Sequence, residues 1–429
     1  MTVNGDVTAK KTKGVRLAVW PNMLCTMALA TIGCTPFLGY NVPNSIKLGL
    51  VLLWVFTAGM FHWFSGKEKG INIVLGVLAF IALQLSYSFI GKSREVAAFL
   101  AHWHNYIFPI AAVYIINHYN LREVRLLWYF IIALFGVNLA SNLLIGFTQG
   151  DIAFRTIAEN AHTNAGGTAF VVGSMLLIPI LWMVLRSGKS RSVKALSICF
   201  IIALVYYILF MNTRATAMLI LFLIMLGFII VDVSKKKQLT QKQLLFRMFL
   251  IGLVLFLFMI PIMNMLSGMF SENYRMAARL TDISTVMEQG DVDDLGEGSL
   301  YVRSLLWLAS INTFLGSVTN FLFGVGESVI DTDFYSLLEN GVSNHSEFFD
   351  LAARYGLLGI TIVVFVIKSS RRFFNALSTD RKIRNYLFAF FIGVLVFGFF
   401  NNLSNNMTSM LMIFLVLPLT VILINRKVI

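Results

Sequence analysis

The sequence predicts an all-α polytopic membrane protein with about twelve transmembrane helices and one large extracytoplasmic loop. Hydrophobic residues make up 58% of the chain and charged residues only 13%, whereas an average soluble domain is about half apolar and a quarter charged. The mean hydropathy of the chain is +0.78. Its apolar residues also fall into runs of about 20, the length that crosses the hydrocarbon of a bilayer as a helix.

Twelve such runs follow one another along the chain. Their approximate bounds are 17–38, 45–64, 71–90, 96–117, 124–147, 166–185, 193–211, 215–233, 246–266, 353–368, 386–403 and 408–425. The chain therefore divides into nine helices over 1–266, a polar loop over 267–352 and three helices over 353–429. The loop is much longer than an ordinary connector between helices, which predicts that it carries function.

Basic residues are divided unequally between the two sides of this arrangement. With twelve spans, 25 of the 34 Lys and Arg residues lie on one side of the membrane. Basic residues mark the cytoplasmic side, so both termini are predicted to be cytoplasmic and the large loop extracytoplasmic. The net charge of +13 is thus an orientation signal. It does not indicate nucleic acid as a partner, because that would require a basic face on a soluble module.

Several kinds of site are not indicated. Cys25, Cys34 and Cys199 lie in apolar segments without the spacing of metal ligands, and we interpret them as small buried hydrophobic residues. No P-loop, dinucleotide-binding glycine pattern or Cys/His cluster occurs in the chain. Asp331 and Asp333 form a D-x-D pattern, but the nucleotide sugars that such sites bind would be cytoplasmic, opposite this loop. We therefore expect neither a cofactor nor a metal site.

Arginines that face outward are scarce, and two of them are candidate site residues. Arg214 opens the span 215–233. A cation there is costly at the edge of the hydrocarbon and unfavourable at a helix N-terminus, and a bound anion would resolve both problems. Arg303 lies on a predicted amphipathic helix, where it shares a face with Trp307 and Ile311. The alternatives are a snorkelling or salt-bridged structural arginine at 214 and a surface salt bridge at 303.

His345 differs from the other five histidines because it lies in the polar loop just before a span. Histidine titrates near neutral pH, which suits proton transfer. Glu347 and Asp350 follow it closely. Upstream, Gly324-Val325-Gly326 is predicted to end the amphipathic helix with a tight turn. His162, in an outer connection beside two asparagines, is a weaker candidate.

These residues belong to motifs that resemble, in order, the O-antigen ligase and polymerase superfamily of bacterial enzymes. Asn344-His345-Ser346, nine further residues and Gly356-Leu357-Leu358-Gly359 resemble the C-terminal motif of the family. Four other segments resemble the family's T-R-A/G motif, its S-x-x-x-R-x-x-x-W stretch, its F-G-x-G turn and the polar start of an earlier span: Asn212–Thr216, Ser299–Trp307, Phe323–Gly326 and Asn164–Thr168. The resemblance covers residues 150–365.

The resemblance implies a C-type glycosyltransferase-like fold and an inverting, metal-independent transfer of a glycan from undecaprenyl diphosphate. The reaction would take place at the outer face of the bacterial plasma (inner) membrane. Arg214 and Arg303 would clamp the diphosphate, and His345 would orient or deprotonate the attacking sugar hydroxyl. The implied partners are the lipid-linked glycan, membrane lipids, a flippase and a chain-length regulator. The remaining site candidates are Asn344, Glu347 and His162.

Two reactions remain open within the family. A polymerase joins lipid-linked repeat units or chains, whereas a ligase transfers the finished chain to lipid A–core. The sequence from Asn344 to Gly356 is more similar to that of polymerases of repeat-unit polysaccharides, which favours polymerisation. A flippase or other transporter of lipid-linked oligosaccharides is the alternative of another class. Transporters usually show internal repeats and intramembrane charged or broken-helix sites. This sequence shows no convincing repeat and most of its candidate charged residues lie in the large loop, so transport is disfavoured.

Overall fold

A computed structural model describes the helical bundle and part of the loop region. The residues that it describes are 13–35, 38, 41–61, 66–89, 104–159, 168–211, 215–234, 239–257, 300–326, 342, 346–401 and 406–429. Every regular element in these ranges is a helix, and none is a strand, so the predicted all-α class is confirmed for this part of the chain.

The described elements overlap all of the predicted apolar runs. They are α1 (Lys13–Cys34), α3 (Asn44–Phe61), α4 (Ile71–Phe89), η1 (His104–Tyr106), α6 (Ile107–His118), α7 (Leu121–Glu159), α8 (Thr168–Ser187), α9 (Arg191–Tyr206), η2 (Tyr207–Met211), α10 (Ala215–Val233), α11 (Gln241–Leu257), α14 (Leu300–Leu315), α15 (Val318–Phe323), α16 (Glu347–Leu377), α17 (Arg381–Phe400), α18 (Met407–Leu411), η4 (Met412–Val416) and α19 (Leu417–Asn425).

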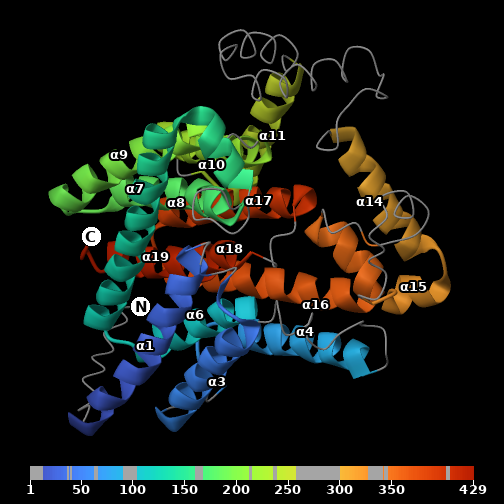
Figure 1. Ribbon diagram of the computed structural model, residues 1–429, viewed down its shortest axis with the longest axis horizontal. Helices are drawn as coiled ribbons and strands as arrows, with labels where there is room; N and C mark the ends of the chain where they lie inside the picture. Colours follow the sequence, from blue (N-terminus) through green and yellow to red (C-terminus); the bar gives the residue numbers. More distant parts are fainter. Residues whose placement is uncertain are drawn as a thin grey trace.

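Seven segments in the described part of the chain are long and apolar enough to cross a membrane: Ile71–Phe89, Leu121–Ile145, Phe170–Ser187, Arg191–Leu209, Glu347–Leu377, Arg381–Phe400 and Met407–Asn425. The chain is therefore a multi-pass helical membrane protein. Its most deeply buried candidate spans are α8 and the segment from α18 to α19, which lie in the middle of the bundle (Figure 1). Trp128 of α7 donates a hydrogen bond of 2.7 Å to Thr420 of α19 and ties this centre to a neighbouring helix.

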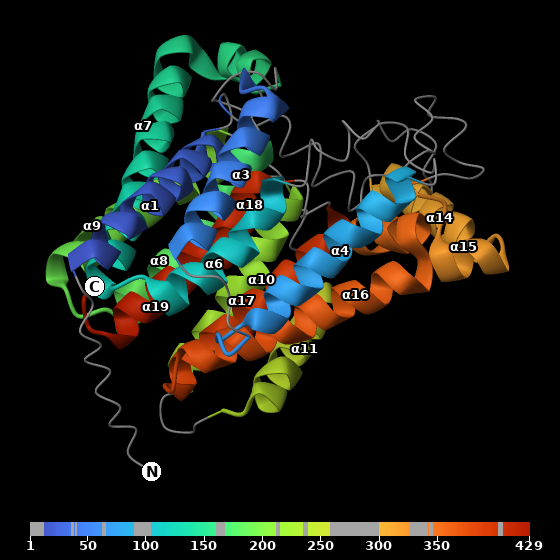
Figure 2. The same cartoon turned by 90° about the horizontal axis from the view of Figure 1, so that it is seen from below.

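Two predicted spans differ most from the structure. Helix α7 runs for 39 residues to Glu159, well past the predicted end of the span at 147. No proline interrupts this stretch, and in Figure 2 the helix projects from one edge of the bundle and bends near its far end. Helix α16 begins at Glu347 and ends at Leu377, whereas the sequence predicted a span over 353–368.

The helix predicted in the loop is present as α14. The prediction that Gly324 ends it is wrong, because α14 already ends at Leu315. Gly316 follows, and the Ser317 hydroxyl accepts a hydrogen bond of 3.0 Å from the Asn320 backbone and starts α15. Gly324 instead terminates this second, six-residue helix. Helices α14 and α15 lie at the end of the bundle where α16 begins (Figure 1).

Candidate active site

The structure describes part of the predicted site. Arg303 lies in the first turns of α14, and Glu347 is the half-buried first residue of α16. Ser346, which directly follows His345, is described and caps α16. The predicted site residues that lie outside the described residues are His162, Arg214, Asn344 and His345.

Two glycine motifs singled out by the sequence pack against each other. The backbone N–H of Val325 donates to the carbonyl of Ala353 at 2.9 Å, and that of Gly326 donates to Arg354 at 2.8 Å. These bonds join the turn after α15 to the last turn of the first segment of α16. The F-G-x-G and G-L-L-G motifs thus form one backbone junction.

Only glycine fits the two central positions of this junction. Gly324 and Gly356 have positive φ angles of 70° and 58°, a region that other residues adopt at a cost. A Cβ atom on Gly324 would also lie 2.3 Å from the carbonyl carbon of Arg354, and one on Gly356 would lie 2.6 Å from the backbone nitrogen of Phe323. Gly356 therefore breaks α16 into a short first segment and a longer second segment.

Aromatic residues of α4 pack against this junction. The Tyr87 hydroxyl donates a hydrogen bond to the carbonyl of Phe323. The Tyr87 and Tyr355 rings pack edge to face with centroids 5.3 Å apart, and Phe80 packs on Tyr355 at 5.5 Å. Helices α4 and α16 lie side by side in both views (Figures 1 and 2), so the motif junction rests on a membrane-spanning helix.

A buried carboxylate links α14 to the start of α16. Asp350 is 1% exposed. Its Oδ1 accepts a hydrogen bond of 2.7 Å from the Ser310 hydroxyl, and its Oδ2 accepts one of 2.9 Å from the Ser346 backbone N–H. The Ser346 hydroxyl in turn accepts from the Phe349 backbone at 3.3 Å. The residue that follows His345 is therefore held on two sides.

This link connects the helix that carries Arg303 to Ser346, the residue after His345. Arg303 precedes Ser310 by seven residues, so both lie on one face of α14, about 10 Å apart along its axis. Ser310 bonds to Asp350, and Asp350 bonds to the neighbour of His345. The positions of Arg303 and Ser346 are thus fixed relative to each other through a single side chain.

The end of α17 completes this region. The backbone N–H of Glu347 donates to the carbonyl of Asn401 at 3.2 Å, and the Ser346 hydroxyl donates to that of Gly398 at 3.5 Å. The rings of Phe348 and Phe399 pack with centroids 4.6 Å apart. Helix α14, the first turn of α16 and the last turn of α17 therefore meet beside the position of His345.

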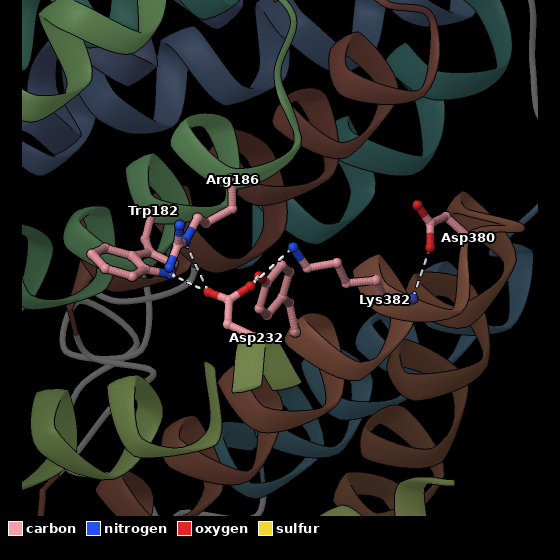
Figure 3. Close-up of polar contacts among 6 residues, drawn as sticks. Trp182, Arg186, Asp232, Asp380 and Lys382 are labelled. Carbon is pink, nitrogen blue, oxygen red and sulfur yellow. Dashed lines mark hydrogen bonds and ion pairs between the residues drawn. The ribbon is translucent and has the colours of Figure 1, made fainter. Parts of the chain in front are cut away.

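A second polar cluster lies elsewhere and was missed by the sequence analysis. The carboxylate of Asp232, near the end of α10, pairs with Arg186 of α8 at 3.0 Å and with Lys382 of α17 at 2.9 Å. Figure 3 shows these side chains pointing toward Asp232, together with Trp182, whose indole N–H donates to it at 3.2 Å. The Tyr386 hydroxyl is a fourth donor.

This cluster joins three helices at the side of the bundle that is predicted to be cytoplasmic. Asp232 is 5% exposed, and a buried carboxylate near the end of an apolar helix requires partners. The signal was available in the sequence, because Asp232 is an acid inside an otherwise apolar run. Its partners could not be identified, because they lie 46 to 154 residues away along the chain.

No group of three or more His, Cys, Asp or Glu side chains that could hold a metal ion occurs among the residues that the structure describes. Asp331 and Asp333 lie outside those residues. No protein-family model matches the chain, and none of the curated proteins matches it. The resemblance to the O-antigen ligase and polymerase superfamily therefore rests on the motifs, and what it implies is taken up as a proposal.

Proposed function

We propose that this protein is a polysaccharide polymerase. It joins undecaprenyl-diphosphate-linked oligosaccharide repeat units at the outer face of the bacterial inner membrane by inverting, metal-independent glycosyl transfer. The observation that most supports the proposal is the hydrogen-bonded link from Ser310 through Asp350 to Ser346. It fixes the helix that carries Arg303 relative to the residue that follows His345, as a shared site requires.

The proposed reaction needs few groups. A sugar hydroxyl of the acceptor attacks the anomeric carbon of the donor from the face opposite the diphosphate. The bond between that carbon and the diphosphate oxygen breaks, and His345 takes the proton of the hydroxyl. Arg214 and Arg303 hold the diphosphate and stabilise the negative charge that develops on it. Undecaprenyl diphosphate leaves, so no ATP is consumed.

The proposal includes twelve spans, a C-type glycosyltransferase-like arrangement and cytoplasmic termini, with residues 267–352 outside. The unequal division of basic residues supports this orientation. A single cysteine introduced at Asp293 tests it. A membrane-impermeant thiol reagent should label this cysteine in spheroplasts without disruption of the inner membrane. Labelling only after disruption would contradict the proposed topology.

Reconstituted protein supplied with lipid-linked repeat units tests the activity. Wild-type protein should produce a ladder of longer lipid-linked chains on a gel, and His345→Ala should lower the rate by about 100- to 10,000-fold. Normal ladders from His345→Ala would remove that residue from the mechanism. Transfer to lipid A–core without chain growth would identify a ligase instead. Movement of the lipid across the bilayer, with no glycosidic bond formed to either acceptor, would identify a transporter.

A further inference from the structure

Two buried hydrogen-bond donors next to the proposed site have no acceptor. They are the indole Nε1 of Trp307 in α14 and the side-chain Nδ2 of Asn401 after α17, and neither atom has a partner within the structure as described. Each donor would bond to water in the unfolded chain, so burying it without an acceptor is unfavourable. An acceptor that arrives with a ligand could satisfy both of these donors.

Both donors flank the first turn of α16. The Trp307 ring packs edge to face on Phe400 with centroids 5.5 Å apart, and it lies 6.1 Å from Phe349. Asn401 directly follows Phe400, and its carbonyl accepts the hydrogen bond from the Glu347 backbone. Asn401 therefore bonds to the first turn of α16, and Trp307 packs on a ring of that same turn.

The surroundings of these donors are aromatic and partly accessible. Phe349 lies between Trp307 and Phe399, with the Phe349 and Phe399 centroids 6.0 Å apart. Phe399 is 46% exposed, and the rings of Phe348, Phe349 and Phe400 are half-buried. A ligand that uses this region can cover aromatic faces next to the two N–H groups.

The charges and hydrogen bonds of the first turn disfavour an anionic ligand here. The backbone N–H groups of Ser346, Glu347 and Phe349 already bond to Asp350, Asn401 and the Ser346 hydroxyl respectively. Glu347 and Asp350 also place two carboxyl groups in this turn. A diphosphate would therefore meet like charge in this turn, whereas a neutral ligand would not, and its acceptor oxygens could use the two vacant donors.

We infer that Trp307 and Asn401 form a subsite for a sugar ring of the acceptor glycan. The hydroxyl oxygens of a sugar accept hydrogen bonds from the two N–H groups, and its apolar C–H face packs on the aromatic rings. This inference rests on the proposed function, in which His345 adjoins the attacking hydroxyl and the arginines hold the diphosphate of the donor. The sugar beside His345 then belongs to the acceptor.

The test measures binding of a sugar that lacks the lipid diphosphate. The probe is the repeat-unit oligosaccharide of the bacterium that produces the protein, released from its lipid carrier by mild acid. It is titrated calorimetrically into the full-length protein in lipid nanodiscs. Trp307→Phe keeps an aromatic ring and removes the N–H group, and Asn401→Ala removes the amide. Each variant should weaken binding by about 3- to 10-fold.

Thermal stability separates this subsite from a structural hydrogen bond. Because Trp307 Nε1 has no acceptor, Trp307→Phe should leave the melting temperature of the ligand-free protein unchanged or raise it. Trp20→Phe, on exposed surface of α1, and Asn312→Ala, on the exposed face of α14, are the matched controls and should bind like wild type. A lower melting temperature for Trp307→Phe, with unchanged binding, would overturn the inference.

The same measurements distinguish failure of the subsite from failure of the proposed function. If both variants bind the oligosaccharide as tightly as wild type while all three proteins extend lipid-linked chains, the subsite is wrong and the polymerase stands. If wild type binds the oligosaccharide through Trp307 and Asn401 yet forms no glycosidic bond, the subsite stands and the polymerase is wrong. If wild type does not bind the oligosaccharide at all, the subsite is wrong.

Discussion

Two buried aspartates, one at each end of the bundle, are satisfied in different ways. Asp232, on the predicted inner side, accepts from Arg186 and Lys382 and is 5% exposed. Asp350, on the predicted outer side, accepts from the Ser310 hydroxyl and the Ser346 backbone and is 1% exposed. The first carboxylate offsets positive charge between helices, whereas the second orients neutral groups next to the proposed site.

This difference separates stability from positioning. Removing one partner from a buried ion pair leaves a charge without compensation, so Asp232 should matter chiefly for folding. Hydrogen bonds between a carboxylate and neutral donors contribute modestly to stability but fix distances and angles. Asp350 should therefore matter chiefly for the geometry of the residues that it joins. The following predictions test that division, from the largest expected effect to the smallest.

The largest effect is expected at Arg214 and Arg303. Arg214→Ala and Arg303→Ala should each lower polymer formation by at least about 100- to 1,000-fold, because each removes a donor that stabilises the leaving diphosphate. Lysine at either position should restore little activity, since a point charge cannot reproduce the bidentate fork of arginine. The measurement is the rate of chain extension per amount of inserted protein.

An inner arginine serves as the control for these variants. Arg186→Ala removes a guanidinium that bonds to Asp232, in the other region. The Arg186→Ala protein that inserts should extend chains at a rate near that of wild type. Wild-type rates from Arg214→Ala or Arg303→Ala would exclude the affected arginine from the site. Loss of the protein from the membrane would instead indicate a structural role for it.

Asp350 should show a smaller effect that depends on the substitution. Asp350→Ala removes both acceptors between Ser310 and Ser346, so turnover should fall by about 10- to 100-fold as the neighbouring groups lose their alignment. Asp350→Asn should retain most activity. Its amide oxygen can accept from the Ser346 backbone while its NH₂ group donates to the Ser310 hydroxyl, which can rotate to accept.

The rescue by asparagine is the informative measurement. Turnover and the KM for acceptor should both return toward wild-type values in Asp350→Asn, with equal amounts of inserted protein. If Asp350→Asn is as defective as Asp350→Ala, the negative charge itself is required, and Asp350 does more than position Ser346. Equal activity in all three proteins would mean that the link from Ser310 to Ser346 does not govern the site.

At Asp232, replacement by asparagine should lower stability and leave activity nearly unchanged. An amide cannot offset the charges of Arg186 and Lys382, whose side chains are 44% and 35% exposed and can turn partly toward water. Asp232→Asn should therefore lower the free energy of unfolding by about 1–3 kcal/mol. The activity of the protein that remains folded should change by less than about twofold. Thermal unfolding in detergent measures the first effect, and a wild-type melting temperature would contradict the structural role.

The contrast between the two aspartates also shows what the sequence could predict. Hydropathy located the apolar helices, seven of which are long enough to cross a membrane, and the spacing of Arg303, Trp307 and Ile311 located α14. Both signals depend on neighbours along the chain. The bond between Ser310 and Asp350 spans 40 residues, and the bond between Tyr386 and Asp232 spans 154. Such contacts depend on how helices pack, which local patterns do not specify.

The glycine motifs were predicted only in part. The sequence predicted a tight turn at Gly324 and placed Gly356 in a motif, and the structure shows that only glycine tolerates their backbone conformations and close contacts. It did not predict that the two motifs pack against each other, nor that Gly356 interrupts a continuous helix. Asn401 gave no local signal at all, because its place beside Glu347 depends on the packing of α17 against α16.

The smallest expected effect is that of metal removal, and the two aspartates give the reason. Both carboxylate oxygens of Asp350 accept hydrogen bonds, and both of Asp232 are engaged by cationic side chains. Neither group offers a vacant oxygen pair to a divalent ion, which takes several oxygen ligands. Chain extension by purified protein should therefore proceed in EDTA at the rate seen without it. Loss of turnover in EDTA, restored by magnesium or manganese, would contradict the metal-independent mechanism. It would direct attention to Asp331 and Asp333, whose D-x-D pattern is the strongest metal-binding signal that the sequence contains.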